Sequence, residues 1–245
     1  MTTTQSASRT ARERARAELT REIKEEARRQ LAVQGASGLS LRAVARELGM
    51  VSSALYRYFR SRDELLTALI IDAYDALGAA AEEASSGRPA ADIRGRWRAV
   101  CGSVRNWARA NPHEYALIYG SPVPGYQAPQ ATVASAIRVV RVMGGILADA
   151  QAGAGAAAGA AARRAAARHP GEPLPPELAP QVAIIAEVIA PGVDDGVLAR
   201  ALIAWTQLFG MISFELFGQF VGSLEPADPF FGYTVERMAD YIGLA

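Results

Sequence analysis

The stretch that most constrains the fold of this chain runs from Leu41 to Phe59, with the sequence LRAVARELGMVSSALYRYF. Its first apolar residues recur at intervals of three and four, which is the spacing of one helix face. Gly49 follows, and glycine readily adopts the positive φ at which helices end. Leu55 and Phe59, four residues apart, indicate a second short helix. We therefore predict two short helices joined by a tight turn, with a basic, aromatic outer face small enough to enter the major groove of DNA.

Helices on both sides of this stretch are expected to complete a small head. Upstream, an apolar stripe with a spacing of four predicts a helix from Thr10 to near Gly35, and residues 1–9 are expected to be disordered. Ser40 is expected to cap the helix that starts at Leu41. Downstream, Ser61-Arg62-Asp63-Glu64 has the pattern of a capping box and predicts the start of a long helix. The expected core of the head consists of Ile23, Ala27, Leu31, Val44, Ala45, Leu48, Leu55 and Phe59.

Charge divides the chain at the same place. The formal net charge is only +1, but residues 1–62 contain 13 basic and 6 acidic side chains, a balance of +7. Residues 63–245 contain 13 basic and 19 acidic side chains, a balance of −6. A basic N-terminal quarter on an acidic remainder predicts a polyanion-binding head on a body that does not bind the polyanion.

The remainder also has helical patterns, and no run alternates apolar and polar residues as a strand does. Further helices are predicted over residues 91–110, 112–119, 132–151, 181–189, 195–221 and 229–242. Residues 152–176 are rich in alanine, glycine and proline, and we interpret them as a mobile insertion. The expected fold is all-α with nine or ten helices, divided into a DNA-binding domain, residues 1–62, and a helical domain, residues 63–245.

Several classes of function are disfavoured by what the sequence lacks. It has no Gly-x-Ser-x-Gly or His-Glu-x-x-His motif, and its two histidines are His113 and His169. A single cysteine, Cys101, provides neither an internal disulfide nor zinc-ligand spacing. We therefore expect no catalytic residues, no metal and no cofactor. No membrane span or secretory signal is expected either, which favours the cytoplasm.

The head resembles TetR-type transcriptional repressors. That family combines a helix-turn-helix ending in Leu-Tyr-x-His/Tyr-Phe with a Lys-Glu-Glu-Leu-like helix start, and this chain has Leu55-Tyr56-Arg57-Tyr58-Phe59 and Arg62-Asp63-Glu64-Leu65. Val51 stands where the family commonly has serine, so Ser52 is expected to serve as the helix cap. Arg60 stands where proline is usual.

The C-terminal part resembles the subgroup of these regulators named for a Trp-His-Gly signature. The matching segments are Asn111-Pro112-His113-Glu114-Tyr115 and Trp205-Thr206-Gln207-Leu208-Phe209-Gly210. The histidine of the signature is Phe209 here, which implies a more apolar pocket.

The resemblance implies how the head meets double-stranded DNA. The helix near Ser52 would enter the major groove, where Arg57 would reach a guanine or a phosphate. Arginines before residue 17 form either an arm along the DNA or a solvated helix end. The expected DNA-binding residues are Ser40, Arg42, Ser52, Ser53, Tyr56, Arg57, Tyr58 and Arg62.

The resemblance also implies a homodimer and a small-molecule effector. The last two helices would form the dimer interface, with Gly210, Gly218 and Gly222 allowing close approach. Aromatic residues of the helical domain either pack in its core or line an apolar cavity for a hydrophobic or aromatic molecule. The expected ligand-binding residues are Trp97, Cys101, Tyr115, Tyr119, Met143, Trp205 and Phe209.

The function that these features favour is a dimeric repressor that a small molecule releases from a palindromic operator. A ligand-independent DNA-binding activator and a helical protein-interaction module are the alternatives. Selection of a palindromic site by the protein would distinguish a dimeric regulator from an interaction module.

Overall fold

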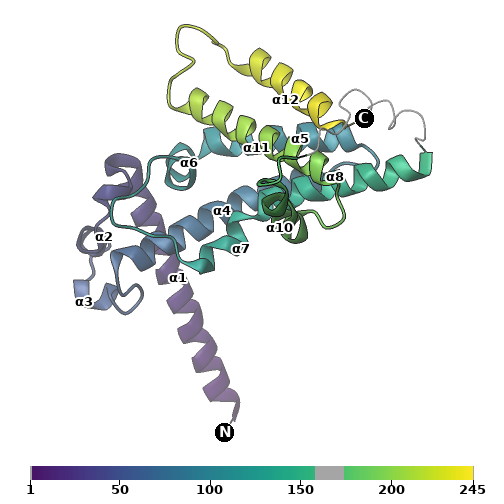
Figure 1. The fold of residues 1–245 in the computed structure, drawn as a ribbon. Helices are drawn as coiled ribbons and strands as arrows, with labels where there is room; N and C mark the ends of the chain where they lie inside the picture. Colours follow the sequence, from purple (N-terminus) through teal and green to yellow (C-terminus); the bar gives the residue numbers. More distant parts are fainter. Residues whose placement is uncertain (1, 158–173, 245) are drawn as a thin grey trace. The chain divides into compact units, whose positions relative to one another are not determined.

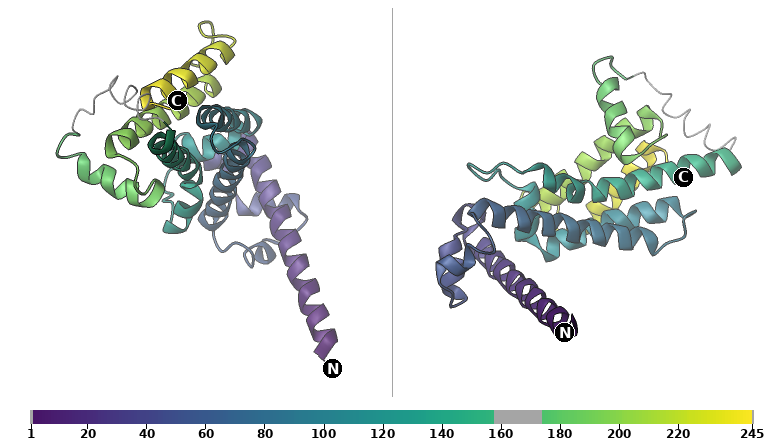
Figure 2. Two further views of the ribbon diagram at one scale, coloured as in Figure 1. Left: turned by 90° about the vertical axis from the view of Figure 1, so that its right-hand side faces the viewer. Right: turned by 90° about the horizontal axis from the view of Figure 1, so that it is seen from below.

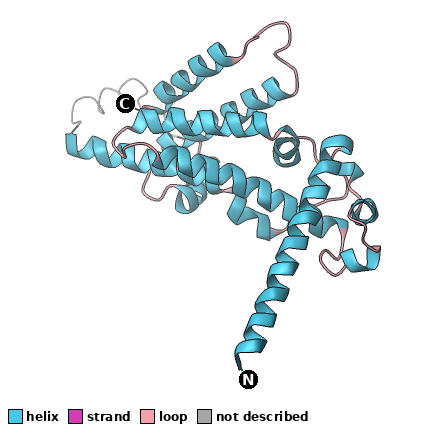
Figure 3. Cartoon of the chain, turned by 180° about the vertical axis from the view of Figure 1, so that it is seen from behind, coloured by secondary structure: helices cyan, strands magenta, loops and turns pink. Residues whose placement is uncertain are grey.

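The computed structural model describes residues 2–157 and 174–244, with side chains from residue 11 onward except those of residues 154–157. These residues form eleven α-helices and two short 3-10 helices, and Figure 3 shows them as helices joined by loops with no strand in the described part. The expected all-α class is confirmed, with one or two helices more than the sequence predicted. The chain divides into two compact units, residues 1–73 with 113–132 and residues 74–112 with 133–245.

The first unit is larger than the expected domain 1–62. It contains α1 (Thr2–Gln34), α2 (Leu41–Glu47), α3 (Ser52–Leu55), the first part of α4 (Arg62–Ser86) and α6 (Pro112–Tyr119), together with the 3-10 helices η1 (Ala36–Gly38) and η2 (Gln130–Thr132). Figure 1 labels these helices, except the two 3-10 helices.

The long helix α1 begins earlier than predicted. It is one continuous helix from Thr2 to Gln34, so residues 2–9, which were expected to be disordered, belong to it (Figure 2). The sequence from Thr2 to Gln34 contains no glycine or proline, and its alanine, arginine and glutamate residues favour helix strongly. Polar composition alone was therefore a poor predictor of where the helix starts.

The core of the first unit follows the predicted apolar stripes. Seven of the eight expected core residues are buried, and Leu48 is half-buried. Leu65 and Leu66 at the start of α4 are fully buried, and Leu39 and Leu41 are also buried. The apolar faces of α1, α2 and α4 thus form much of the hydrophobic core of the first unit.

The capping box before α4 forms with one change. The Glu64 backbone N–H donates to Ser61 Oγ at 3.1 Å, as predicted. The Glu64 carboxylate accepts from the backbone N–H of Arg60 at 2.6 Å, one residue before the expected donor. The first contact satisfies a donor that the helix start leaves open, so the sequence pattern located the start of α4 correctly.

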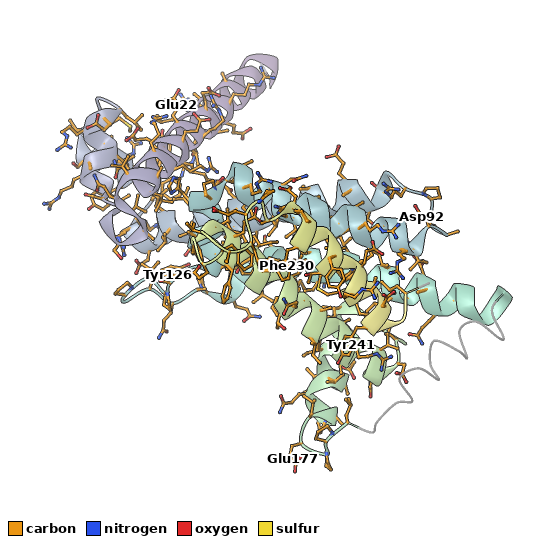
Figure 4. The ribbon with its side chains drawn as sticks, turned by 90° about the horizontal axis from the view of Figure 1, so that it is seen from above. Glu22, Asp92, Tyr126, Glu177, Phe230 and Tyr241 are labelled. Atoms are coloured by element: carbon orange, nitrogen blue, oxygen red, sulfur yellow. The ribbon has the colours of Figure 1, made fainter. Side chains whose placement is uncertain are left out.

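The second unit contains the rest of α4 and six further helices. These are α5 (Ile93–Ala110), α7 (Val133–Ala136), α8 (Arg138–Ala157), α10 (Ala179–Ile189), α11 (Asp195–Leu216) and α12 (Asp228–Ile242). Asp92, labelled in Figure 4, caps α5 by accepting from the Gly95 N–H at 3.0 Å. Asp194 caps α11 in the same way, accepting from the Val197 N–H at 3.0 Å.

Three boundaries in this unit differ from the prediction. The helix expected over 132–151 is broken between α7 and α8 by a bend of 43°. Helix α8 then continues to Ala157, so residues 152–157 of the expected insertion are helical; its alanines outweigh Gly153 and Gly155. Residues 158–173 of that insertion lie outside the described part. Helix α11 ends at Leu216 instead of Val221.

The early end of α11 changes the role of two glycines. Gly218 and Gly222 lie beyond the helix with φ of +83° and +73°, a region that glycine adopts without strain. Both glycines lie in turns between α11 and α12. They therefore do not continue the line of glycines from Gly210 that we expected along this helix. Gly210 does lie on α11, and a Cβ added there would meet nothing within 4 Å.

Arginines of α5 fasten the two C-terminal helices within this unit. Arg105, with a side chain only 7% exposed, donates twice to Glu215 at 2.7 Å and once to Asp228 at 3.0 Å. Arg94 and Arg98 both hydrogen-bond Glu236 of α12. These hydrogen bonds, that from Arg98 above all, lower the pKa of Glu236 to about 2.

Helix α11 is also, by length and composition alone, the one described helix that meets the criteria for a membrane span. Core helices of soluble proteins meet the same criteria. About a third of its apolar window is buried, including Leu198, Leu208 and Ile212, and Ile203 and Phe214 are exposed.

Candidate nucleic-acid interface

The turn between α2 and α3 has the geometry that the glycine predicted. Gly49 has φ +65°, its N–H donates to Arg46 O at 3.1 Å, and the Met50 N–H donates to Ala45 O at 2.8 Å. This pair of bonds is the Schellman motif, which satisfies the last carbonyls of a helix while reversing the chain. At the other end of α2, Ser40 Oγ accepts from the Ala43 N–H at 3.4 Å, which confirms the expected cap.

Helix α3 is shorter than expected, and no side chain caps its N-terminus. It spans Ser52–Leu55, and turns then carry the chain to Phe59, whose N–H donates to Leu55 O at 3.1 Å. Val51 occupies the cap position and makes no side-chain cap bond. The expectation that Ser52 serves as the cap is therefore wrong: Ser52 is the first residue inside the helix.

The expected DNA-binding residues fall into two groups by exposure. Arg42, Ser53, Tyr56 and Arg57 are exposed on the two short helices and the turn that follows them. Ser40, Ser52, Tyr58 and Arg62 are half-buried. Arg46 and Arg60, which the sequence reasoning did not select, are exposed cations on the same segment and add to its positive charge.

Arg62 has a second set of partners inside the head. Its guanidinium donates to Leu39 O at 3.2 Å and to Ala36 O at 2.8 Å. These bonds hold the connection between α1 and α2, so Arg62 has a structural role whether or not it also meets a phosphate. Its role as a direct DNA contact stays a prediction.

Arg16 of α1 contacts the turn after α3, at Arg57 and Tyr58. Its guanidinium carbon lies 5.2 Å from the centre of the Tyr58 ring, and Nη2 donates to Arg57 O at 3.5 Å. A cation over an aromatic face is attracted by the ring electrons. Arg16 thus holds the backbone of Arg57 while the Arg57 side chain stays exposed.

An ion-pair group within the first unit was missed by sequence reasoning. Arg28 of α1 donates to Glu114 of α6 at 2.9 Å and to Asp72 of α4 at 2.7 Å. Lys24 also donates to Asp72, at 2.8 Å. The group ties α1 to α4 and α6, and no local pattern predicts a pair that is 86 residues apart in the chain.

Comparison with known proteins identifies the head and the rest of the chain together. The family model "Bacterial regulatory proteins, tetR family" matches residues 23–69, and "Tetracyclin repressor-like, C-terminal domain" matches residues 97–238. The HTH-type transcriptional regulators Rv1816 of Mycobacterium tuberculosis and Mb1846 of Mycobacterium bovis are each 42% identical over 206 residues, covering 84% of this chain and 84% of theirs. The chain belongs to the tetR family.

Solved structures agree with this assignment. The crystal structure of SCO4313 has a TM-score of 0.69 and 34% sequence identity, and the match covers 92% of this chain and 97% of that one. The TetR family transcriptional regulator PfmR of Thermus thermophilus has a TM-score of 0.51 at 18% identity, covering 91% and 98%, and shares the fold. The chain is thus an HTH-type transcriptional regulator that binds DNA, and members of its family are not enzymes.

The expected ligand-binding residues of this regulator are divided between the units. Tyr115 and Tyr119 of α6 belong to the first unit, with ring centres 5.3 Å apart. Trp205 and Phe209 of α11 belong to the second, with ring centres 5.7 Å apart. The remaining three, Trp97, Cys101 and Met143, are buried in the second unit.

Two of these residues have the surroundings of core side chains. Trp97 is 1% exposed, and its indole N–H donates to Val235 O at 3.1 Å, so it is already satisfied. Cys101 is fully buried, and burial raises the pKa of its thiol well above the ordinary range. Trp205 differs, because its indole Nε1 is buried and has no hydrogen-bond partner in the described part of the regulator.

Proposed function

We propose that the chain is a homodimeric repressor that binds a palindromic operator through α2 and α3 and is released by a small apolar molecule. The observation that carries the operator-binding part is the set of exposed side chains Arg42, Ser53, Tyr56 and Arg57, on a segment whose Leu55 is fully buried. Exposed cations and hydroxyls suit the phosphates and base edges of a major groove.

Dimerisation is supported by an exposed apolar face on the last two helices. Ile203 and Phe214 of α11 are each 54% exposed, and Tyr233 of α12 is 64% exposed. Gly210, with open space beside it, lies on α11 between Ile203 and Phe214. Contiguous exposed apolar surface marks an association site in soluble proteins. Helix-turn-helix dimers bind two half-sites about 34–36 Å apart, so a two-fold dimer suits a palindromic operator.

The effector proposal rests on the pair formed by Trp205 and Phe209. A buried indole N–H without an acceptor costs about 1–3 kcal/mol, and a ligand with an acceptor oxygen would remove that cost. We therefore propose an aromatic or hydrophobic effector that carries a carbonyl, ether or hydroxyl oxygen. The segment from Trp205 to Gly210 supports the proposal that the chain belongs to the Trp-His-Gly subgroup, and Phe209 in place of the signature histidine supports a more apolar pocket.

Repression of a chromosomal operator implies action in the cytoplasm, where the DNA lies. The test is selection of binding sites from random duplex DNA with the purified full-length protein, followed by gel shift on the enriched site. The proposal expects a palindrome, a dimer by light scattering, and affinity that falls steeply with salt. Enrichment of a site without two-fold symmetry, or a monomer on the DNA, would contradict it.

A further inference from the structure

Val51 is the most exposed apolar side chain between Leu41 and Phe59. It is 70% exposed, whereas Leu55 beside it is fully buried. Its backbone is extended, with φ −71° and ψ 138°, and its carbonyl accepts from the Ala54 N–H at 2.9 Å. The side chain therefore occupies the position immediately before α3 and adds nothing to the core of the head.

Valine is a poor choice at this position for stability alone. A helix cap normally supplies a side-chain oxygen for an open N–H, and replacing such a residue by an apolar one costs about 1 kcal/mol. Val51 makes no cap bond, and its exposed methyl groups gain nothing from burial. A residue that breaks local rules without a structural gain points to a function.

The neighbours of Val51 indicate what it would touch. Ser53 and Arg57 are exposed polar side chains on the same short segment, suited to the polar edges of bases and to phosphates. Val51 is the exposed apolar side chain beside them, and it suits an apolar group on a base. In the major groove the apolar group presented by an unmodified base is the C5-methyl group of thymine.

We propose that Val51 contacts the C5-methyl group of one thymine in each operator half-site and so contributes to sequence specificity. The proposal rests on the proposed docking of α3 in the major groove. Burying one methyl group between protein and DNA is worth about a four-fold change in affinity, or about fifteen-fold for two half-sites.

The experiment uses the enriched operator with each pair of symmetry-related thymines, one in each half-site, replaced together by deoxyuridine, which removes only the methyl groups. For the wild-type protein we expect one symmetric pair of positions at which the replacement weakens binding by about fifteen-fold. In Val51→Ser the same replacement should have less than a two-fold effect. Because serine restores the cap, that variant should melt at the wild-type temperature or above.

Val33 provides a matched control. It is a valine near the end of α1 that is 83% exposed, and Val33→Ala should leave the deoxyuridine effect unchanged. The proposal is overturned if no thymine position responds in the wild type, if the operator has no thymine in its half-sites, or if Val51→Ser keeps the full response. An operator that is bound equally well with deoxyuridine refutes only the role of Val51. Failure to enrich any site refutes the proposed function as well.

Discussion

Replacement of Arg105 with alanine is expected to destabilise the second unit severely. The Arg105 side chain is 7% exposed, donates twice to Glu215 at 2.7 Å, and lies with its guanidinium carbon 4.6 Å from the Phe231 ring centre. It therefore joins α5 to α11 and α12 through charge, hydrogen bonds and packing. Glu215, whose side chain is 16% exposed in the intact protein, loses its main partner when Arg105 is removed.

The magnitude follows from which partner is buried. Breaking a buried ion pair by removing one member costs about 3–5 kcal/mol in free energy of unfolding. Asp228, the other partner, is 63% exposed, so losing the ion pair between Arg105 and Asp228 adds at most about 1 kcal/mol to the destabilisation. For a chain of this size each kcal/mol lowers the melting temperature by about 2–4 °C, so we expect a decrease of about 10 °C.

The assay is urea unfolding followed by far-UV circular dichroism, with Arg109→Ala as the matched control. Arg109 is 50% exposed and lies 3.8 Å from both Glu215 and Asp228, so its loss should cost less than about 1 kcal/mol. The double variant Arg105→Met, Glu215→Leu should recover most of the loss, because an apolar pair leaves no buried charge. Equal losses for the two single arginine variants would refute the reasoning.

Three further predictions test other parts of the regulator. Gly210→Glu should convert the dimer to a monomer by light scattering, while Gly145→Glu, also at an exposed helical glycine with open space around it, should not; a dimeric Gly210→Glu protein would exclude α11 from the interface. Because the pKa of Glu236 is depressed from 4.5 to about 2, its contribution to stability is complete above the ordinary glutamate pKa and is lost as pH falls toward 2. Melting temperatures between pH 7 and 3 should therefore fall less in Glu236→Gln than in the wild type, and parallel profiles would contradict this. Trp205→Phe should keep operator affinity within two-fold but bind 2-acetylnaphthalene and 2-ethylnaphthalene equally, whereas the wild type should prefer the ketone by about ten-fold. An unchanged preference in the variant would assign the acceptor contact to another residue.

Local signals in the sequence predicted several local contacts correctly, although the expected cap at Ser52 was wrong. Ser40, Ser61 and Asp194 each accept a hydrogen bond from the N–H three residues later, so a short pattern contains the whole interaction. Gly49 is similar, because the need for positive φ is a property of one residue. The helix-turn-helix was predictable for these reasons.

Helix ends and long-range contacts were less predictable. Helix α8 extends to Ala157 despite two glycines, because its alanines have a high helix propensity. Helix α11 ends at Leu216, five residues before the predicted end. The pairs Arg28–Glu114 and Arg105–Glu215 join residues 86 and 110 positions apart, and only the folded chain brings them together.

Within the candidate interface, residue type predicted which side chains are exposed better than it predicted their hydrogen-bond partners. Arg42 and Arg57 are exposed as expected of DNA contacts, but Arg62 donates to carbonyls of its own chain. For the expected ligand residues, aromatic character did not reveal that Tyr115 and Trp205 belong to different compact units. Membership of a site depends on the tertiary contacts, which single-residue properties do not encode.

The central claim is that the exposed face of α2, α3 and the turn after α3 reads the operator, and the operator affinity of Arg57→Ala tests it most directly. Gel shift on the enriched palindrome should show a loss of at least about ten-fold per half-site for this variant. Arg141→Ala, which removes an exposed arginine from the second unit, should bind like the wild type. If Arg57→Ala bound the palindrome with wild-type affinity, the face described here would not be the one that reads DNA.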